Sequence, residues 1–126
     1  MLLIDEVVEL KPMESIEASL YIDPSWELFK GHFPGAPVFP GVMSVECMAQ
    51  AADIMLMTAE KYKGKTPLIA GITDTRFYKK IAPGVQVRAC VKVKKENAEK
   101  AVITCSAEIY LGDDLAAETV VTLAMR

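Results

Sequence analysis

The stretch from Val42 to Ala59 constrains the fold more than any other part of this chain, because apolar residues occupy nearly every side of the helix it would form. A helix that is apolar all round is buried in a protein core or in a membrane. Glu46, Gln50 and Asp53 interrupt the stretch, and such groups are costly at the centre of a bilayer. The sequence therefore predicts a long buried helix from about Gly41 to Tyr62, without a membrane span.

The polar residues of this helix form a seam. Glu46, Gln50 and Asp53 are spaced i, i+4 and i+7, which places them on one face. An unpaired buried carboxylate is costly, so we expect Glu46 to have polar partners or to line a cavity. We expect Gln50 to hydrogen-bond backbone near the preceding loop, and Asp53 to be paired or to reach solvent at a dimer surface.

The beginning of the helix offers groups that suit acid–base chemistry. Helical side chains lean toward the N-terminus, so the Glu46 carboxyl would reach back toward the free N–H groups near Gly41. These N–H groups and the helix dipole suit a carbonyl oxygen that gains negative charge. Residues 31–41, rich in glycine and proline, carry the only histidine, His32. The alternatives are a structural or exposed His32 and a non-catalytic core carboxylate at Glu46.

Alternating apolar residues predict a sheet in the rest of the chain. A short helical turn is expected at Trp26–Phe29, and Gly112-Asp113-Asp114 is a strong hairpin signal. The predicted strands are Leu2–Leu10, Ser15–Ile22, Leu68–Tyr78, Val85–Lys95, Ala101–Leu111 and Leu115–Met125. About six antiparallel strands and one long central helix predict an α+β hotdog fold, with residues 1–126 as a single domain.

Composition limits the classes of function. The net charge of −3 argues against nucleic acid as the main partner. Asp5 and Glu6 break the opening apolar run before it reaches signal-peptide length, so we expect no signal peptide. Cys47, Cys90 and Cys105 lack metal-site spacing and are expected to be reduced, mostly buried residues of a cytoplasmic protein.

The string His-Phe-Pro-Gly-x-Pro-x-x-Pro-Gly-Val-x-x-x-Glu, from His32 to Glu46, closely resembles the signature of the FabZ-type β-hydroxyacyl-(acyl carrier protein) dehydratases. Ala49-Gln50-Ala51-Ala52 resembles the continuation of that signature. Weaker similarity covers Leu2–Leu10 and the region from Arg76-Phe77 to Pro83-Gly84. The resemblance implies reversible dehydration of (3R)-hydroxyacyl thioesters on acyl carrier protein to trans-2-enoyl thioesters, with no metal and no redox cofactor.

The resemblance also implies roles for particular residues. His32 would remove the C2 proton as general base, and its other ring nitrogen would donate to the Val38 carbonyl. The Gly41 N–H would hold the thioester oxygen, and Glu46 would protonate the departing C3 hydroxyl. Gln50 would support these groups. In this family the two catalytic side chains come from different subunits of a homodimer, which often assembles into a trimer of dimers.

Two departures from the family pattern are visible. The family usually has a further stretch before the strand equivalent to Leu2–Leu10, so we expect a different tunnel mouth or dimer edge. The common Pro-Gly-Asp is here Pro83-Gly84-Val85, which predicts an altered turn. Neither departure touches His32 or Glu46.

Basic residues suggest where an acidic carrier protein would dock on this acidic protein. The candidates are Arg76, Lys79, Lys80 and Arg88, with Lys30 as the next; the alternative is a solvated strand end. Two other functions stay open at this point. One is a hotdog thioesterase, in which a carboxylate and water cleave the acyl group, and the other is a non-catalytic acyl-carrier or lipid-binding relative.

Overall fold

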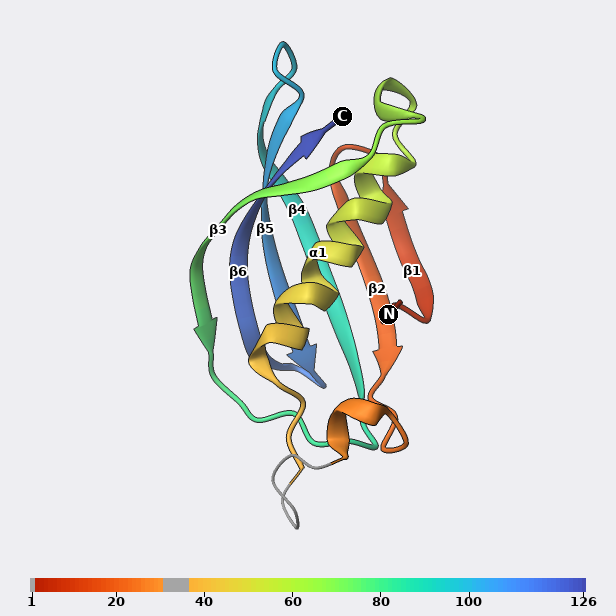
Figure 1. Cartoon of the computed structure of the whole chain (residues 1–126), viewed down its shortest axis with the longest axis vertical. Helices are drawn as coiled ribbons and strands as arrows, with labels where there is room; N and C mark the ends of the chain where they lie inside the picture. The colour runs from red at the N-terminus through yellow and green to blue at the C-terminus, as the bar shows by residue number, and fades with distance from the viewer. Residues whose placement is uncertain (1, 31–36) are drawn as a thin grey trace.

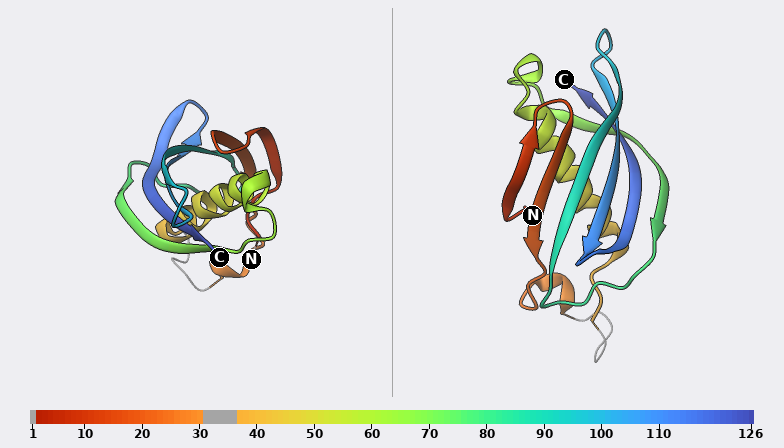
Figure 2. Two further views of the ribbon diagram at one scale, coloured as in Figure 1. Left: turned by 90° about the horizontal axis from the view of Figure 1, so that it is seen from above. Right: turned by 180° about the vertical axis from the view of Figure 1, so that it is seen from behind.

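The computed structural model describes residues 2–30 and 37–126, in which six antiparallel strands form one sheet that curls around one long helix (Figures 1 and 2). The strand order is β1-β2-β4-β5-β6-β3, which leaves β1 and β3 at the edges. The predicted α+β hotdog architecture is confirmed. The elements are β1 (Glu6–Lys11), β2 (Ser15–Tyr21), η1 (Glu27–Phe29), α1 (Gly41–Met57), η2 (Glu60–Tyr62), β3 (Pro67–Phe77), β4 (Gln86–Asn97), β5 (Val102–Leu111) and β6 (Asp114–Met125).

The core lies between α1 and the concave face of the sheet. Val87, Ala89 and Val91 of β4 are buried, as their alternation predicts, and they face buried Met48 and Met55 in the same core cluster. Cys47 and Cys105 are also buried, and burial raises the pKa of each thiol to about 12. These two cysteines are therefore neutral core residues, as predicted.

Helix α1 is shorter than the sequence predicts. It ends at Met57, where the Thr58 hydroxyl donates to the carbonyls of Ile54 at 2.8 Å and Met55 at 3.1 Å. Ala59 then has an extended backbone, and the chain continues as the separate turn η2. None of the helices in the described residues is long and apolar enough to cross a membrane.

The first strand also begins later than predicted, at Glu6 rather than at Leu2. Leu3 turns away from β2, because it is fully buried in the core and its backbone N–H donates to the Gln50 side chain at 2.7 Å, whereas the Asp5 N–H still donates to the Ser19 carbonyl at 2.9 Å. The Asp5 carboxylate accepts a hydrogen bond from the backbone N–H of Tyr21. Leu3 is therefore held by α1, while Asp5 remains hydrogen-bonded to β2.

Strand β3 contains two register irregularities in its pairing with β6. Each inserts one extra residue into β3, the first between Ile69 and Gly71 and the second between Thr73 and Arg76. Asp74 within the second has a φ of 52°, in the left-handed region. A single extra residue reverses the side-chain alternation beyond it. The two bulges therefore decide which β3 side chains face the helix.

Candidate active site

The backbone that leads into α1 is held against the segment that follows β3. The Phe39 N–H donates to the Ile81 carbonyl at 2.7 Å, and Phe39 is buried. Pro40 has an extended backbone, and its carbonyl accepts the N–H groups of Met43 and Ser44. Helix α1 begins at Gly41, whose N–H precedes the first intrahelical bond and is one of the orphan donors of a helix start. A developing oxyanion placed here meets an N–H and the positive end of the helix dipole.

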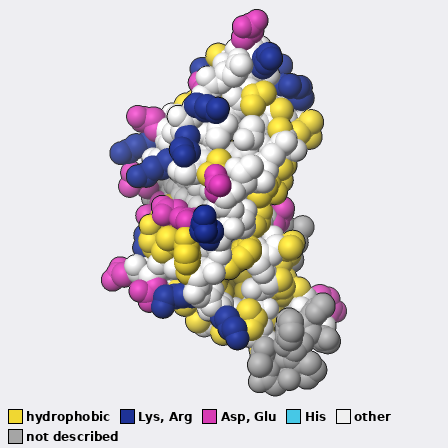
Figure 3. All heavy atoms as spheres, turned by 90° about the vertical axis from the view of Figure 1, so that its left-hand side faces the viewer, with side chains coloured by type: hydrophobic (Ala, Val, Ile, Leu, Met, Phe, Trp, Pro, Cys, Tyr) yellow, Lys and Arg dark blue, Asp and Glu magenta, His cyan; other side chains and the backbone are white. Residues whose placement is uncertain are grey.

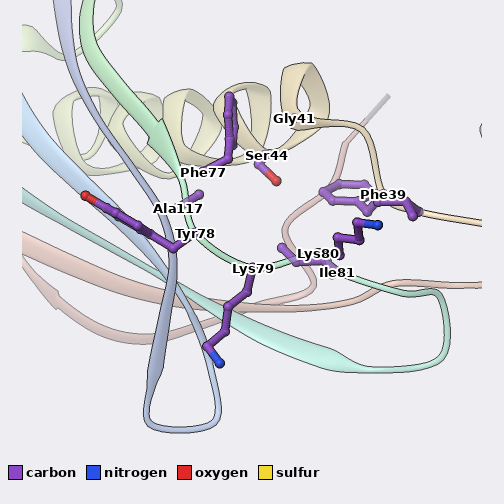
Figure 4. A pocket seen from close by; sticks show the side chains of 10 residues that line it. Phe39, Gly41, Ser44, Phe77, Tyr78, Lys79, Lys80, Ile81 and Ala117 are labelled. Atoms are coloured by element: carbon purple, nitrogen blue, oxygen red, sulfur yellow. The ribbon is translucent and has the colours of Figure 1, made fainter.

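Gly41 lies against the aromatic ring of Phe77. A Cβ on Gly41 would lie 2.8 and 2.9 Å from two carbons of that ring. Real Cβ atoms do not approach a neighbour so closely, so any larger residue would displace the ring. Figure 4 shows Phe77 beside α1 near Gly41 and Ser44. The close approach explains a glycine at the start of the helix.

A pocket of about 390 Å³, here called the entry pocket, opens at this helix start (Figure 4). It brings together Val38 and Gly41, the two backbone groups that the sequence analysis assigned to the site. It is lined by Val38, Phe39, Gly41, Ser44, Phe77, Tyr78, Lys79, Lys80, Ile81 and Ala117.

A second cavity, of about 580 Å³, lies between α1 and β3 and is mostly apolar. We call it the apolar groove. It is lined by Val42, Met43, Val45, Glu46, Ile69, Ile72 and Phe77. Glu46 supplies its only charged side chain among the described residues. A carboxyl group on the wall of an apolar cavity is suited to act on a polar group carried by an apolar chain.

The bulges of β3 create the far wall of this groove. Ile69, Ile72 and Phe77 are oddly spaced, yet they pair with Leu123, Val121 and Ala117, which are buried on the concave face of β6. All three β3 side chains therefore face the helix side of the sheet. Sequence reasoning did not identify them as site residues, although Gly71 within a strand is a recognised signal of a bulge.

The groove leaves one side of the helix uncovered, which corrects the expectation that α1 is buried all round. Val42 is 77% exposed, and Phe77 is 54% exposed. Glu46 is exposed in the single chain rather than buried. Figure 3, which looks onto the β3 edge, shows hydrophobic side chains along one side of this face. The reason is that the sheet of one chain covers only one side of α1.

Gln50 links the Glu46 carboxylate to the N-terminal segment. Its side-chain oxygen accepts the Leu3 N–H at 2.7 Å, and its Nε2 donates to Glu46 Oε1 at 3.1 Å. Because Leu3 fixes which end of the amide is the acceptor, the amide nitrogen is directed toward the carboxylate. Among the described residues, the backbone partner of Gln50 is thus Leu3 of the N-terminal segment rather than the preceding loop, and Glu46 Oε2 accepts no hydrogen bond within these residues.

Asp53 is the third member of the polar seam. Its Oδ1 is buried, and it has no hydrogen-bond partner among the described residues, so the predicted pairing is not seen there. Burial, with a smaller contribution from the negative charge of Glu46, raises the pKa of Asp53 to about 6. Asp53 is therefore a half-buried carboxyl that ionises less readily than an exposed one.

The remaining predicted site residues are distributed as follows. His32 lies outside the described residues. Lys79 and Lys80 line the entry pocket, and Lys79 also forms an ion pair with Asp114 at 3.4 Å. Arg88 lies on β4, where it pairs with Glu17 at 3.3 Å and lies over the Tyr110 ring. Lys30 pairs with Glu27 at 3.3 Å.

Within residues 2–30 and 37–126, no three His, Cys, Asp or Glu side chains gather closely enough to hold a metal ion. The site instead consists of a helix N-terminus, a carboxylate held by an amide, and an apolar groove. The fold and this site define a hotdog protein suited to an acyl thioester.

Comparison with known proteins places the chain in a family. The family model described as a FabA-like domain matches residues 1–120. The chain is 37% identical to the 3-hydroxyacyl-[acyl-carrier-protein] dehydratase FabZ of Symbiobacterium thermophilum, across 98% of this chain and 86% of the relative. It is 38% identical to the FabZ of Lactiplantibacillus plantarum, across 96% and 81% of the two chains. This chain belongs to the FabA-like family.

Solved structures with the same fold have diverged further in sequence. The dehydratase heterocomplex ApeI:P from Xenorhabdus doucetiae matches with a TM-score of 0.77 at 13% identity, covering 98% of this chain and 82% of that chain. A mutant thioesterase from Staphylococcus aureus matches with a TM-score of 0.76 at 13% identity, covering 96% and 92%. At such identities the similarity shows the fold alone.

Proposed function

We propose that residues 1–126 act as one dehydratase domain, which reversibly converts (3R)-hydroxyacyl thioesters of acyl carrier protein into trans-2-enoyl thioesters. Membership of the FabA-like family, with FabZ-named relatives across nearly the whole chain, supports this hydro-lyase function. The observation that carries the proposal is the Glu46 carboxyl, held by Gln50 on the wall of an apolar groove that adjoins the Gly41 helix start.

The first step is proton removal from C2. We assign it to His32, which acts as general base, and we assign orientation of its ring to the Val38 carbonyl. The electrons of the broken C–H bond move onto the thioester oxygen, which the Gly41 N–H and the helix dipole stabilise. One such donor contributes about 3 kcal/mol of transition-state stabilisation.

The second step is loss of the C3 hydroxyl. Glu46 donates a proton to the hydroxyl, which leaves as water while the C2–C3 double bond forms and the thioester carbonyl is restored. Gln50 binds Oε1 of Glu46, so we assign Oε2 to the substrate. The apolar groove holds the acyl chain. Met43 lines this groove, whereas Met48 and Met55 are core residues.

The uncovered side of α1 and the edge strand β3 support a homodimer. Val42, Ile72 and Phe77 expose apolar surface that a second copy would bury, and β3 carries an open edge. We propose that the dimer shares its sites between subunits and that it can assemble into a trimer of dimers. In that case inactive His32→Ala and Glu46→Ala proteins, refolded together, regain activity, up to about half the sites of each heterodimer. Zero recovery in confirmed heterodimers would indicate a site within one chain.

The partner that delivers the substrate is an acyl carrier protein in the cytoplasm. Arg76, Lys79 and Lys80, at and after the end of β3, form the proposed docking rim around the entry pocket. Arg88 and Lys30 are further candidates, and both are already paired with carboxylates.

The experiment that tests the function is turnover of a (3R)-hydroxyacyl-carrier substrate with two readouts. We expect the enoyl absorbance to rise while free thiol stays constant. Release of free thiol would instead identify a thioesterase, and the absence of either signal with bound acyl carrier would identify a non-catalytic acyl-binding relative.

A further inference from the structure

One buried hydroxyl of the entry pocket has no hydrogen-bond partner within residues 2–30 and 37–126. Ser44 is 2% exposed and lines this pocket together with Gly41. Serine in a helix often donates to the carbonyl of residue i−4, but the Pro40 carbonyl accepts the backbone N–H of Ser44 and not its hydroxyl. Figure 4 shows the hydroxyl directed away from α1 and into the pocket. A buried hydroxyl without a partner is costly, so this one is available to a polar group of a ligand.

Ser44 lies on the side of α1 that its own sheet covers. Ser44, Ala51 and Met55 are all buried within the single chain, whereas Val42 and Glu46 lie on the uncovered side of the helix. The burial of Ser44 is therefore complete in one chain and does not depend on a second copy.

The other polar side chains of the entry pocket are exposed. The Tyr78 hydroxyl donates to Glu118 at 2.6 Å, and Lys79 is paired with Asp114 at 3.4 Å. Lys80 is exposed and belongs to the proposed docking rim. Ser44 is thus the polar side chain that a group deep in this pocket would meet.

The position of Ser44 relative to Glu46 indicates which part of the substrate it meets. Two residues along an α-helix correspond to a rotation of about 200°, so the two side chains point to opposite sides of α1. In the proposed mechanism the thioester carbonyl is held at Gly41, and C3 lies at Glu46. The sulfur is bonded to the carbonyl carbon on the side away from C2 and C3. The thiol arm that carries the acyl group is therefore directed into the entry pocket, toward Ser44.

The chemistry of this thiol arm matches the pocket. In acyl carrier protein and in coenzyme A, an ethylene unit separates the sulfur from the first amide of the arm. The walls near Ser44 include the apolar residues Phe39, Ile81 and Ala117, which suit the ethylene unit. A serine hydroxyl can donate to the carbonyl of the amide or accept from its N–H.

We propose that Ser44 is a specificity-determining residue, whose hydroxyl forms a hydrogen bond with the first amide of the thiol arm. The site then prefers thioesters that carry this amide over simple alkyl thioesters of the same length. The inference rests on the proposed function, because it takes the position of the thioester from the proposed mechanism.

Hydration of two crotonyl thioesters by the whole protein tests this inference. Crotonyl-N-acetylcysteamine carries the amide, and S-pentyl thiocrotonate has methylene groups in its place. Ser44→Ala is expected to lower the ratio of their kcat/KM values, amide over pentyl, by about fivefold, the scale of one neutral hydrogen bond. The matched control is Ser19→Ala, a buried serine outside the entry pocket, which should leave the ratio unchanged. Equal losses for both thioesters would place the bond on the thioester carbonyl, and no loss for either would leave the hydroxyl without a role; both results would overturn the proposal.

Two further measurements separate this role from a structural one and from the proposed function. Because the Ser44 hydroxyl has no partner among the described residues and alanine favours helices, Ser44→Ala should keep or raise Tm. A lower Tm would show that the protein itself holds the hydroxyl and would overturn the proposal. Calorimetric binding of butyryl-N-acetylcysteamine relative to S-pentyl thiobutyrate should show the same fall in the ratio without turnover. A wild-type protein without dehydratase turnover would refute the proposed function, while the binding ratio would still judge Ser44.

Discussion

At the scale of single residues, the hydrogen bonds of Gln50 to Leu3 and Glu46 explain how an exposed carboxylate is kept in one position. The Leu3 N–H orients the amide, and the amide orients Glu46. Hydrogen bonds to charged groups are stronger than those between neutral groups. Glu46 therefore depends on a segment far away in sequence, which the Ala-Gln-Ala-Ala pattern alone does not reveal.

Replacing Gln50 tests this positioning role. Gln50→Met keeps the volume and removes the hydrogen bonds to Leu3 and Glu46, so we expect kcat to fall about tenfold, which corresponds to about 1.4 kcal/mol. KM should change less, because Gln50 is not among the residues that line the apolar groove. Gln50→Glu is the companion variant, since it keeps an acceptor for Leu3 but places a like charge beside Glu46; it should be at least as impaired. Unchanged kcat in Gln50→Met would remove Gln50 from the site.

Asp53 predicts a pH-dependent stability. Its folded-state pKa of about 6 lies above the ordinary value of 3.8, so ionisation is disfavoured in the folded protein. The resulting loss of stability is absent below pH 3.8, grows as the pH rises to about 6 and then stays constant. We expect Asp53→Asn to raise Tm by about 3–5 °C at pH 8, which allows for the partial solvent exposure of the group, and by much less at pH 4.5.

The control for this measurement is Asp23→Asn. Hydrogen bonds from the backbone and hydroxyl of Ser25 lower the pKa of partly exposed Asp23, so its substitution should not stabilise the protein at pH 8. An equal Tm shift for Asp53→Asn at both pH values would show that burial of charge is not the cause.

At the scale of elements, β3 depends on the left-handed conformation of Asp74. A β-branched residue is strained at a φ of 52°, whereas glycine is not. We expect Asp74→Val to lower the free energy of unfolding by about 1–2 kcal/mol and Asp74→Gly to be nearly neutral. Urea titration measures both. Ser106→Val, on β5 where Ser106 pairs with Lys92 and Val120, is the control, and an equal loss there would contradict a specific role for the bulge.

The elements were predictable where side-chain alternation or strong turn residues define them. The alternation of β4 predicted its buried face, and Gly112-Asp113-Asp114 predicted the last hairpin, where Leu111 pairs with Asp114. The end of α1 was not predictable from apolar content, because the backbone becomes extended at Ala59, an apolar residue with no glycine or proline beside it. The bulges of β3 are defined by its register with β6. The alternation of side chains along one strand gives no information about this register, so the bulges were not predicted.

The site was predictable to the extent that it is local in sequence. Val38 and Gly41 share the entry pocket, and the i, i+4 spacing placed Gln50 on the same helix face as Glu46, to which it donates a hydrogen bond. Phe77, Ile69 and Ile72 reach the site only through the two bulges. The exposure of Glu46 was not predicted. An apolar helix face can be covered by its own chain or by a second chain, and the sequence pattern is the same in both cases.

At the scale of the whole molecule, the negative net charge would repel an acidic carrier protein, whereas the basic residues around the entry pocket would attract it. The protein carries a net charge of −3, so an acidic carrier protein requires a local basic rim. We expect Lys80→Glu to raise KM for a carrier-bound substrate while sparing crotonyl-CoA, with the difference shrinking as salt is added. Lys100→Glu is the matched control, because Lys100 is exposed in the β4–β5 hairpin at the opposite end of the molecule (Figure 1). Equal losses for both substrates would assign Lys80 to the fold or the pocket.

The measurement that tests the central claim most directly is hydration of a crotonyl thioester by the wild-type protein and by His32→Ala and Glu46→Ala. General acid–base groups contribute on the order of a hundredfold or more, so each variant is expected to fold normally and to lose at least about a hundredfold in turnover. Near wild-type turnover in either variant would contradict a dehydratase site built on His32 and Glu46.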